Sequence, residues 1–93
     1  MIRIKRVRQW EDVLPGFNNA AIVVLVRRGG CHIFVDTMKV SGQQRYQIEQ
    51  AFGGKDCSTF RSIDEISVLV DYHLPRVSSK YARTQLEKLF PQA

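Results

Sequence analysis

AIVVLVRRGG, residues 21–30, is an apolar run that leads directly into two arginines and two glycines. The run is too short to span a membrane, and its β-branched residues are typical of a strand buried in the centre of a sheet. Arg27 and Arg28 end this predicted strand, and the glycine pair after them has the backbone freedom that a tight turn needs. Because a planar guanidinium beside backbone N–H groups suits an anion, we expect the strand end to be a binding site.

The neighbouring segments complete a predicted antiparallel sheet of three to four strands. Residues 31–40 are rich in β-forming residues, and a Ser-Gly turn at residues 41–42 separates them from residues 44–52, in which apolar and polar side chains alternate. Residues 2–7 alternate apolar and basic side chains, which suits an edge strand because charge discourages pairing with other chains. Residues 57–60 are expected to form a short fourth strand.

Helical patterns flank this sheet. Residues 8–14 place apolar side chains on one face of a short helix, and residues 62–74 open with a Ser-x-x-Glu capping box. Residues 79–90 have the apolar spacing of a last helix. The predicted fold class is therefore α+β: a single domain, residues 1–93, with a central antiparallel sheet, a short N-terminal helix and two C-terminal helices packed on it.

The net charge of +5 is concentrated in the first half of the chain. Residues 1–45 contain eight Lys or Arg against three Asp or Glu, whereas residues 46–93 contain six of each. This balance favours an acidic partner, either a nucleic acid or a phosphorylated or acidic protein segment. Residues 1–8 are a basic N-terminal arm or edge strand, and their candidate contacts to nucleic acid are Arg3, Lys5, Arg6 and Arg8.

Residues 1–10 lack the apolar segment of a signal peptide, and the chain has two cysteines, Cys31 and Cys57. We therefore expect an intracellular protein, cytoplasmic or nuclear, with reduced thiols and no membrane segment. The cysteines and histidines lack the paired spacing of a metal site, and the sequence contains no nucleophile-elbow, phosphate-loop or zinc-protease motif. The sequence thus predicts a protein that is not an enzyme and that holds no metal and no cofactor.

The candidate anion site gathers around the turn after the central strand. Arg45, on the next strand but one, joins it if the strand register brings both arginines to one face of the sheet. An ordinary hairpin with solvated arginines is the alternative interpretation. The candidate residues for phosphate or anion binding are Arg27, Arg28, Gly29, Gly30 and Arg45.

Four phrases occur in an order that matches a known family. The phrase VLVR at residues 24–27 is similar to an F-L-V-R strand end whose arginine binds phosphate, and residues 28–31 take the place of a phosphate-binding loop. Residues 45–48, RYQI, resemble a fourth-strand phrase, and residues 60–66, FRSIDEI, resemble the F-x-S-L-x-E-L that precedes a helix. Spread with gaps over residues 8–83, these phrases resemble the Src-homology-2 (SH2) domain. Within that family, residues 32–35, 38–40 and 63–66, and Pro75 followed by residues 81–83, look like the first of the atypical tandem domains of the Spt-six-type transcription elongation factor.

The resemblance implies a non-enzymatic module that binds a phosphorylated or acidic peptide, with Arg27 making the central contact. Two alternatives stay open. One is a small basic protein that binds nucleic acid without sequence preference. The other is a small oligomeric accessory protein of a bacterium or mobile element, without a ligand, whose interface would be anchored by Trp10, Phe17 or Phe90.

Overall fold

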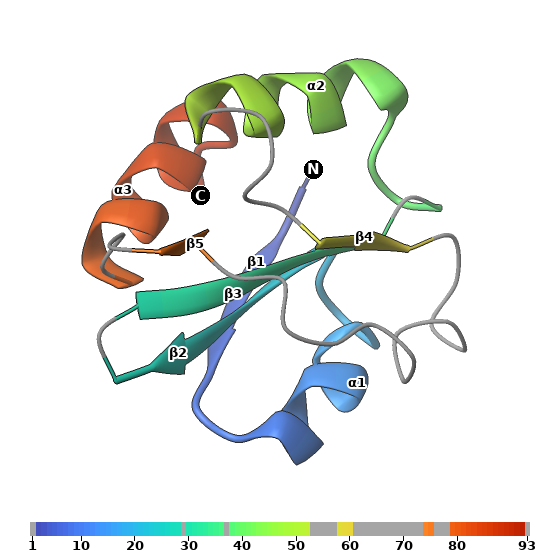
Figure 1. The fold of residues 1–93 in the computed structure, drawn as a ribbon. Helices are drawn as coiled ribbons and strands as arrows, with labels where there is room; N and C mark the ends of the chain where they lie inside the picture. The colour runs from blue at the N-terminus through green and yellow to red at the C-terminus, as the bar shows by residue number, and fades with distance from the viewer. Residues whose placement is uncertain are drawn as a thin grey trace.

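The computed structural model describes residues 2–28, 30–36, 38–52, 58–60, 74–75 and 79–92. Its elements, in chain order, are β1 (Ile4–Val7), the 3₁₀ helix η1 (Trp10–Asp12), α1 (Val13–Gly16), β2 (Ile22–Arg27), β3 (Gly30–Asp36), α2 (Gly42–Ala51), β4 (Ser58–Phe60), β5 (Leu74–Pro75) and α3 (Ser79–Leu89). The sheet has α1 on one face and α2 and α3 on the other (Figure 1). This arrangement confirms the α+β fold class.

The sheet is mixed rather than purely antiparallel. In the part of the chain that the structure describes, five strands lie in the order β1-β2-β3-β4, and β5 also pairs with β3. β2 and β3 are antiparallel, but β1 runs parallel to β2 and β4 runs parallel to β3. The expectation of an antiparallel sheet is therefore wrong for both outer pairs. For β1 the cause is the connection, because residues 8–21 carry the chain through η1 and α1 back to the start of the sheet, as parallel pairing requires.

Side chains of β2 alternate between two separate apolar clusters. The cluster on the α1 face contains Val7, Val13, Phe17, Val23, Leu25 and Phe34. The cluster under α2 and α3 contains Ile22 and Val24 of β2 together with buried residues of β3 and of both helices, among them Ile33, Ile48, Ala82 and Leu86. Residues 22–25 are each 0% exposed, so β2 reaches solvent only at its last two residues.

Residues 44–52 form most of helix α2, so the predicted strand over this segment is wrong. The Ser41 hydroxyl accepts the Gln44 N–H at 3.1 Å, and the Gln44 side chain accepts the Ser41 N–H at 2.9 Å. This reciprocal pair is a capping box, which starts a helix where a hairpin turn was expected. Ile48 and Phe52, four residues apart, are buried on one helical face, whereas Tyr46 is 60% exposed.

Strand β3 ends at Asp36, earlier than the predicted end at residue 40. The Asp36 side chain is buried, and its Oδ1 accepts the backbone N–H of Met38 at 2.9 Å. The Asp36 carbonyl accepts the N–H groups of Lys39 and Val40. Asp36 thus builds the turn that leads to α2, since short polar side chains that bond the backbone two residues on favour turns over strands. The Lys39 ammonium donates to the Phe17 carbonyl and ties this turn to the end of α1.

The other predicted elements can be placed along the chain. Three predicted elements are confirmed: the edge strand within residues 2–7 is β1, the strand within residues 57–60 is β4, and the last helix within residues 79–90 is α3. The short helix expected at residues 8–14 is formed by η1 and α1, but α1 continues to Gly16, beyond the predicted end. The predicted helix over residues 62–74 lies almost entirely outside the described residues. None of the helices in the described ranges is long and apolar enough to cross a bilayer.

Two alanine substitutions on α2 test its burial pattern. Ile48→Ala should lower the free energy of unfolding by about 2–5 kcal/mol, because it removes a wholly buried side chain. Tyr46→Ala should change it by about 0.5 kcal/mol or less, because the ring is mostly in solvent. Urea unfolding of both variants gives the comparison. Equal losses would mean that the two side chains share a buried face, as in a strand.

The stability of the fold should fall in alkali because of Cys31 on β3. Burial raises the pKa of this thiol from 9.0 to about 11. As the pH rises, the unfolded chain therefore loses the thiol proton before the folded chain does. Cys31 has no effect on the free energy of unfolding below pH 9, and it lowers this free energy progressively as the pH rises from 9 to about 11. At ~1.4 kcal/mol per pKa unit the loss approaches ~3 kcal/mol.

Cys31→Ala is the control for this effect, because lysine and tyrosine titrate over the same range. Urea unfolding of both proteins at a series of pH values should show the extra alkaline loss in the parent chain alone. If the free energy of unfolding fell equally with pH in the parent and in Cys31→Ala, the prediction would be contradicted.

Candidate anion-binding site

Arg27 is the last residue of β2 and pairs with Gly30 across the β2–β3 turn. It follows Val23 and Leu25 at the spacing of two residues that keeps side chains on one face of a strand, which here is the α1 face. The strand that carries it is buried up to Leu25, whereas Arg27 is exposed. The fold therefore presents this guanidinium to solvent from a rigid element.

The guanidinium of Arg27 lies over the ring of Trp10, with 5.6 Å between the guanidinium carbon and the ring centroid. The Trp10 ring is held in turn by two β3 side chains, with centroid distances of 5.0 Å to His32 and 5.8 Å to Phe34. Trp10 is 38% exposed, so it covers the end of the α1-face cluster and also meets solvent. A guanidinium that lies over an aromatic ring keeps its in-plane N–H donors available for an anion.

Parallel pairing brings further positive charge to this end of the sheet. Val7 pairs with Leu25, so β1 ends two residues before β2, and Arg8 follows β1 near the end of the sheet where Arg27 ends β2. Arg28 lies in the turn, and all three arginines are exposed. We call Arg8, Arg27 and Arg28 the basic end of the sheet. Adjacent strands lie about 5 Å apart, so these three residues lie at the same end of the sheet on neighbouring segments.

Arg45 does not belong to this site. It lies in the first half of α2, which starts at the opposite end of β3 from the β2–β3 turn (Figure 1). β3 has seven residues and spans roughly 20 Å. Moreover, α2 covers the opposite face of the sheet from Trp10 and α1. The expected convergence of Arg45 with Arg27 is wrong because it assumed a third strand where the capping box starts a helix.

Of the two glycines in the β2–β3 turn, the structure describes one. Gly30 is the first residue of β3 and is partly buried, and Gly29 lies outside the described residues. The structure thus brings Arg27, Arg28 and Gly30 together, as the sequence predicts. Trp10 and Arg8 are the members that sequence reasoning missed. Only the parallel pairing of β1 could have placed them here.

The basic residues of β1 do not form one surface. Arg3, Lys5, Arg6 and Arg8 are all exposed. Lys5 lies toward α1, where its side chain comes near Gly16, whereas Arg6 lies toward α3 and its Nη2 is 3.4 Å from the Ser79 hydroxyl. Successive side chains of a strand point to opposite faces, so the charge of β1 is split between the two faces.

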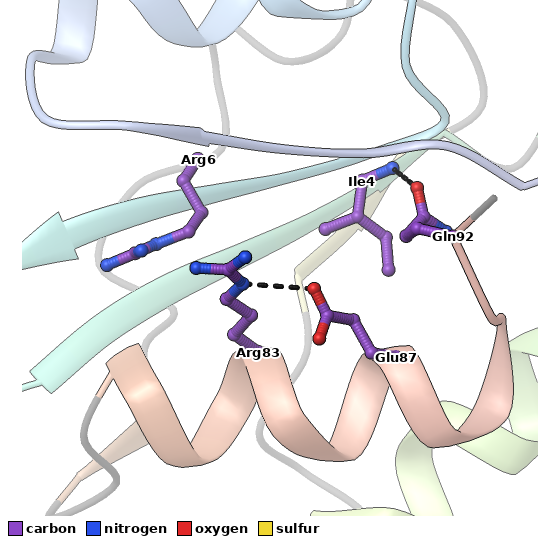
Figure 2. A pocket seen from close by; sticks show the side chains of 5 residues that line it. All are labelled: Ile4, Arg6, Arg83, Glu87 and Gln92. Atoms are coloured by element: carbon purple, nitrogen blue, oxygen red, sulfur yellow. Dashed lines mark hydrogen bonds and ion pairs between the residues drawn. The ribbon is translucent and has the colours of Figure 1, made fainter.

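Two grooves flank the N-terminal segment. One, of about 340 Å³, lies between β1 and α3 and is lined by Ile4, Arg6, Arg83, Glu87 and Gln92 (Figure 2). The other, of about 350 Å³, is lined by Ile2, Arg3, Asn19, Ala20, Ala21 and Lys39. In the second groove the Lys39 ammonium already donates to the backbone carbonyls of Phe17 and Ala20, which reduces its value for an incoming anion.

Within the described ranges, no three His, Cys, Asp or Glu side chains come together in a way that could hold a metal ion. His32 is 7% exposed and stacks on Phe34 with 6.0 Å between ring centroids. No protein-family model, curated protein or solved structure matches the chain.

Proposed function

We propose that this chain is a non-enzymatic binding module that captures a phosphorylated or acidic segment of another protein at the β2–β3 turn. The observation that carries the proposal is the exposed Arg27 guanidinium, held over the Trp10 ring at 5.6 Å. The ring favours positions of the guanidinium over its face before any ligand arrives. A pre-oriented fork of donors loses less side-chain entropy on binding than a free arginine would.

A phosphate suits this site better than a single carboxylate. A phosphate monoester carries ~-1.5 to -2 charge at neutral pH and has three acceptor oxygens. The basic end of the sheet offers three exposed arginines, because Arg28 follows Arg27 in the turn and Arg8 follows the neighbouring strand. Charge-assisted hydrogen bonds of this kind are short and about twice as strong as neutral ones.

The resemblance to SH2 domains is part of the proposal. It is supported by an arginine at the end of a central strand, on the face that carries the short N-terminal helix. The phrase at residues 45–48 belongs to α2, so Arg45 has no role in the proposed site. Most of the phrase at residues 60–66 lies outside the described residues.

Nonspecific nucleic-acid binding is the second candidate, and the four exposed cations of the first eight residues favour it. Their division between two faces of β1 makes them a poor track for one phosphate backbone. The oligomeric alternative loses two of its anchors, because Phe17 is 0% and Phe90 8% exposed. Trp10 is the only one of its three proposed anchors that meets solvent.

Arg27→Ala is the direct test of the phosphate site. We expect it to weaken binding of a phosphotyrosine or phosphoserine peptide about tenfold or more, since a hydrogen bond to a charged group contributes roughly 1.5–3 kcal/mol. The thermal midpoint should change little, because the side chain is exposed. NMR titration of labelled protein gives affinity and location together, with amide shifts expected at residues 27, 28, 30 and 31.

Lys88→Ala is the matched control, because Lys88 is an exposed cation on α3, on the other face of the sheet. It should leave phosphopeptide affinity within about twofold of the parent. If Lys88→Ala weakened phosphopeptide binding as much as Arg27→Ala, the effect would be explained by the net charge of the protein and not by a site at Arg27. A DNA duplex that shifts residues 3–8, with no response to phosphopeptides, would favour the nucleic-acid alternative.

Trp10→Leu tests the aromatic support separately. Leucine keeps apolar cover over the rings of His32 and Phe34 but removes the ring beneath Arg27. We expect affinity for the phosphopeptide to fall about two- to fivefold, in line with ~0.5–1 kcal/mol for an exposed cation–π contact. Trp10 is the sole tryptophan, so its fluorescence in the parent chain should also report binding. Unchanged affinity would show that the Trp10 ring does not help to position Arg27 for binding.

A further inference from the structure

We infer that the outer edge of β1, with the groove between β1 and α3, is a docking site for an extended acidic segment of another protein, which adds to the sheet as a further strand. This inference concerns a different part of the surface from the proposed phosphate site and does not depend on it. It rests on the backbone of β1, the side chains of the groove and the sign of its charge.

Among the described residues, no strand pairs with the backbone of β1 on the side away from β2. The Arg3 carbonyl accepts the N–H groups of Ala21 and Ile22, so residue 3 faces the neighbouring strand. Backbone groups of alternate strand residues point to the same side, and the Ile4 N–H points outward to the Gln92 side chain. The Ile4 carbonyl and both backbone groups of Arg6 therefore face outward too. β1 has β2 as its sole neighbour among the described strands.

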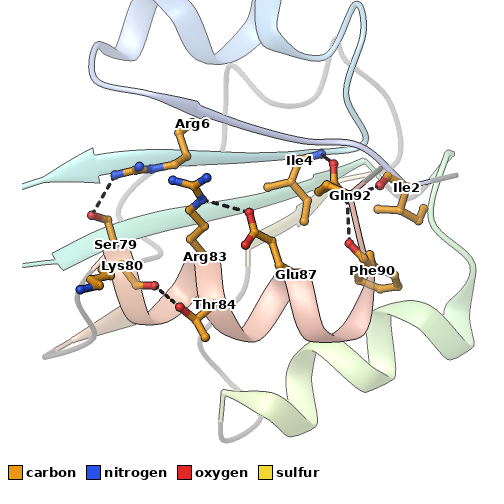
Figure 3. A network of polar contacts seen from close by, with 10 residues as sticks. All are labelled: Ile2, Ile4, Arg6, Ser79, Lys80, Arg83, Thr84, Glu87, Phe90 and Gln92. Atoms are coloured by element: carbon orange, nitrogen blue, oxygen red, sulfur yellow. Dashed lines mark hydrogen bonds and ion pairs between the residues drawn. The ribbon is translucent and has the colours of Figure 1, made fainter.

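Gln92 already shows what this edge can bind. Its side-chain amide accepts the Ile4 N–H at 3.3 Å and donates to the Ile2 carbonyl at 2.8 Å (Figure 3). These are the two contacts that the N–H and C=O of one residue of an added parallel strand would make. The amide of Gln92 thus occupies the first position of a strand-pairing site, and the following positions along β1, from the Ile4 carbonyl to Arg6, continue it.

The groove beside this edge can receive the side chains of an added strand, and its arginines can bind acidic side chains. Ile4 and Arg6 project from β1 toward α3, and Arg83 and Glu87 project from α3 toward β1 (Figure 2). Arg83 Nε is 3.0 Å from Glu87, in an exposed pair that contributes little to stability and can rearrange. A carboxylate on the added strand would enter between Arg6 and Arg83. Lys5, on the opposite face of β1, would meet the alternate side chains.

The charge of this edge selects the occupant. Two copies of the chain paired antiparallel, edge to edge, would bring the cations Lys5 and Arg6 of one strand close to those of the other, and like charges opposite each other are destabilising. A strand with acidic residues on both faces reverses the sign of both contacts. A nucleic acid could use the cations but has no backbone N–H and C=O groups in strand register.

Three acidic peptides, a parent and two N-methylated forms of it, test the backbone contact. The parent peptide has eight residues in which pairs of glutamate alternate with pairs of valine or threonine, so that both faces of its strand carry glutamate. Each of the two methylated peptides has this sequence with N-methyl groups on alternate amides, one on the odd-numbered and the other on the even-numbered positions. Pairing predicts that the parent binds, that one methylated peptide loses at least about tenfold in affinity, and that the other binds like the parent. Equal binding by both methylated peptides, or no binding by the parent, would overturn the inference.

A charge reversal tests the side-chain contact. Arg6→Glu should weaken the parent peptide roughly tenfold or more, whereas Lys88→Glu makes the same charge change on the exposed face of α3 and should have an effect below about twofold. Arg27→Ala should leave this peptide unaffected, which separates the edge site from the phosphate site. Equal weakening by Arg6→Glu and Lys88→Glu would overturn the inference that this edge binds an acidic segment. A molecular mass that rises with protein concentration, and that falls when Arg6 is changed to Glu, would overturn it too, because a second copy of the chain would then be the occupant.

Discussion

The two-sided burial of β2 is the constraint on which the rest of this structure depends. Residues 22–25 are 0% exposed, and neighbouring residues belong to different apolar clusters. A strand of this kind needs cover on both faces, and the chain supplies it with α1 on one side and with α2 and α3 on the other. Solvent reaches β2 only at its end. That end carries Arg27, so the burial of the strand also determines where its one charged side chain lies.

The sequence predicts the parts of this fold whose signal is local. The apolar run of β2, the alternation of β1 and the amphipathic pattern of α3 all have the period of the element they form. Residues 44–52 show why a short pattern misleads, because Ile48 and Phe52 fit both a period of two and a spacing of four. The deciding signal was the Ser-x-x-Gln box at residues 41–44. The parallel pairing of β1 has no local signature, because it depends on the path of the chain through α1.

The candidate site divides in the same way. Arg27 was predictable, since a charged residue after a buried run marks a strand end. The support of its guanidinium by Trp10 was not, because the helical spacing of residues 8–14 only assigns Trp10 to an apolar face. Its position over β3 depends on how η1 crosses the sheet, where the rings of His32 and Phe34 receive it. Arg45 was misplaced by the error in α2 alone, which shows how one wrong element alters a site assembled from several strands.

The direction of β1 connects the two surfaces for which we propose partners. In an antiparallel arrangement the basic N-terminal segment would have ended at the far side of the sheet from Arg27. Because β1 is parallel to β2, Arg6 and Arg8 approach the same end as Arg27 and Arg28. Six of the eight lysines and arginines in residues 1–45 thus lie on one edge and one end of the sheet, and Lys39 and Arg45 lie elsewhere. An edge strand so charged repels a second copy of itself, and the same charge attracts an acidic strand. Protection against self-association and selection of an acidic partner therefore follow from one set of side chains.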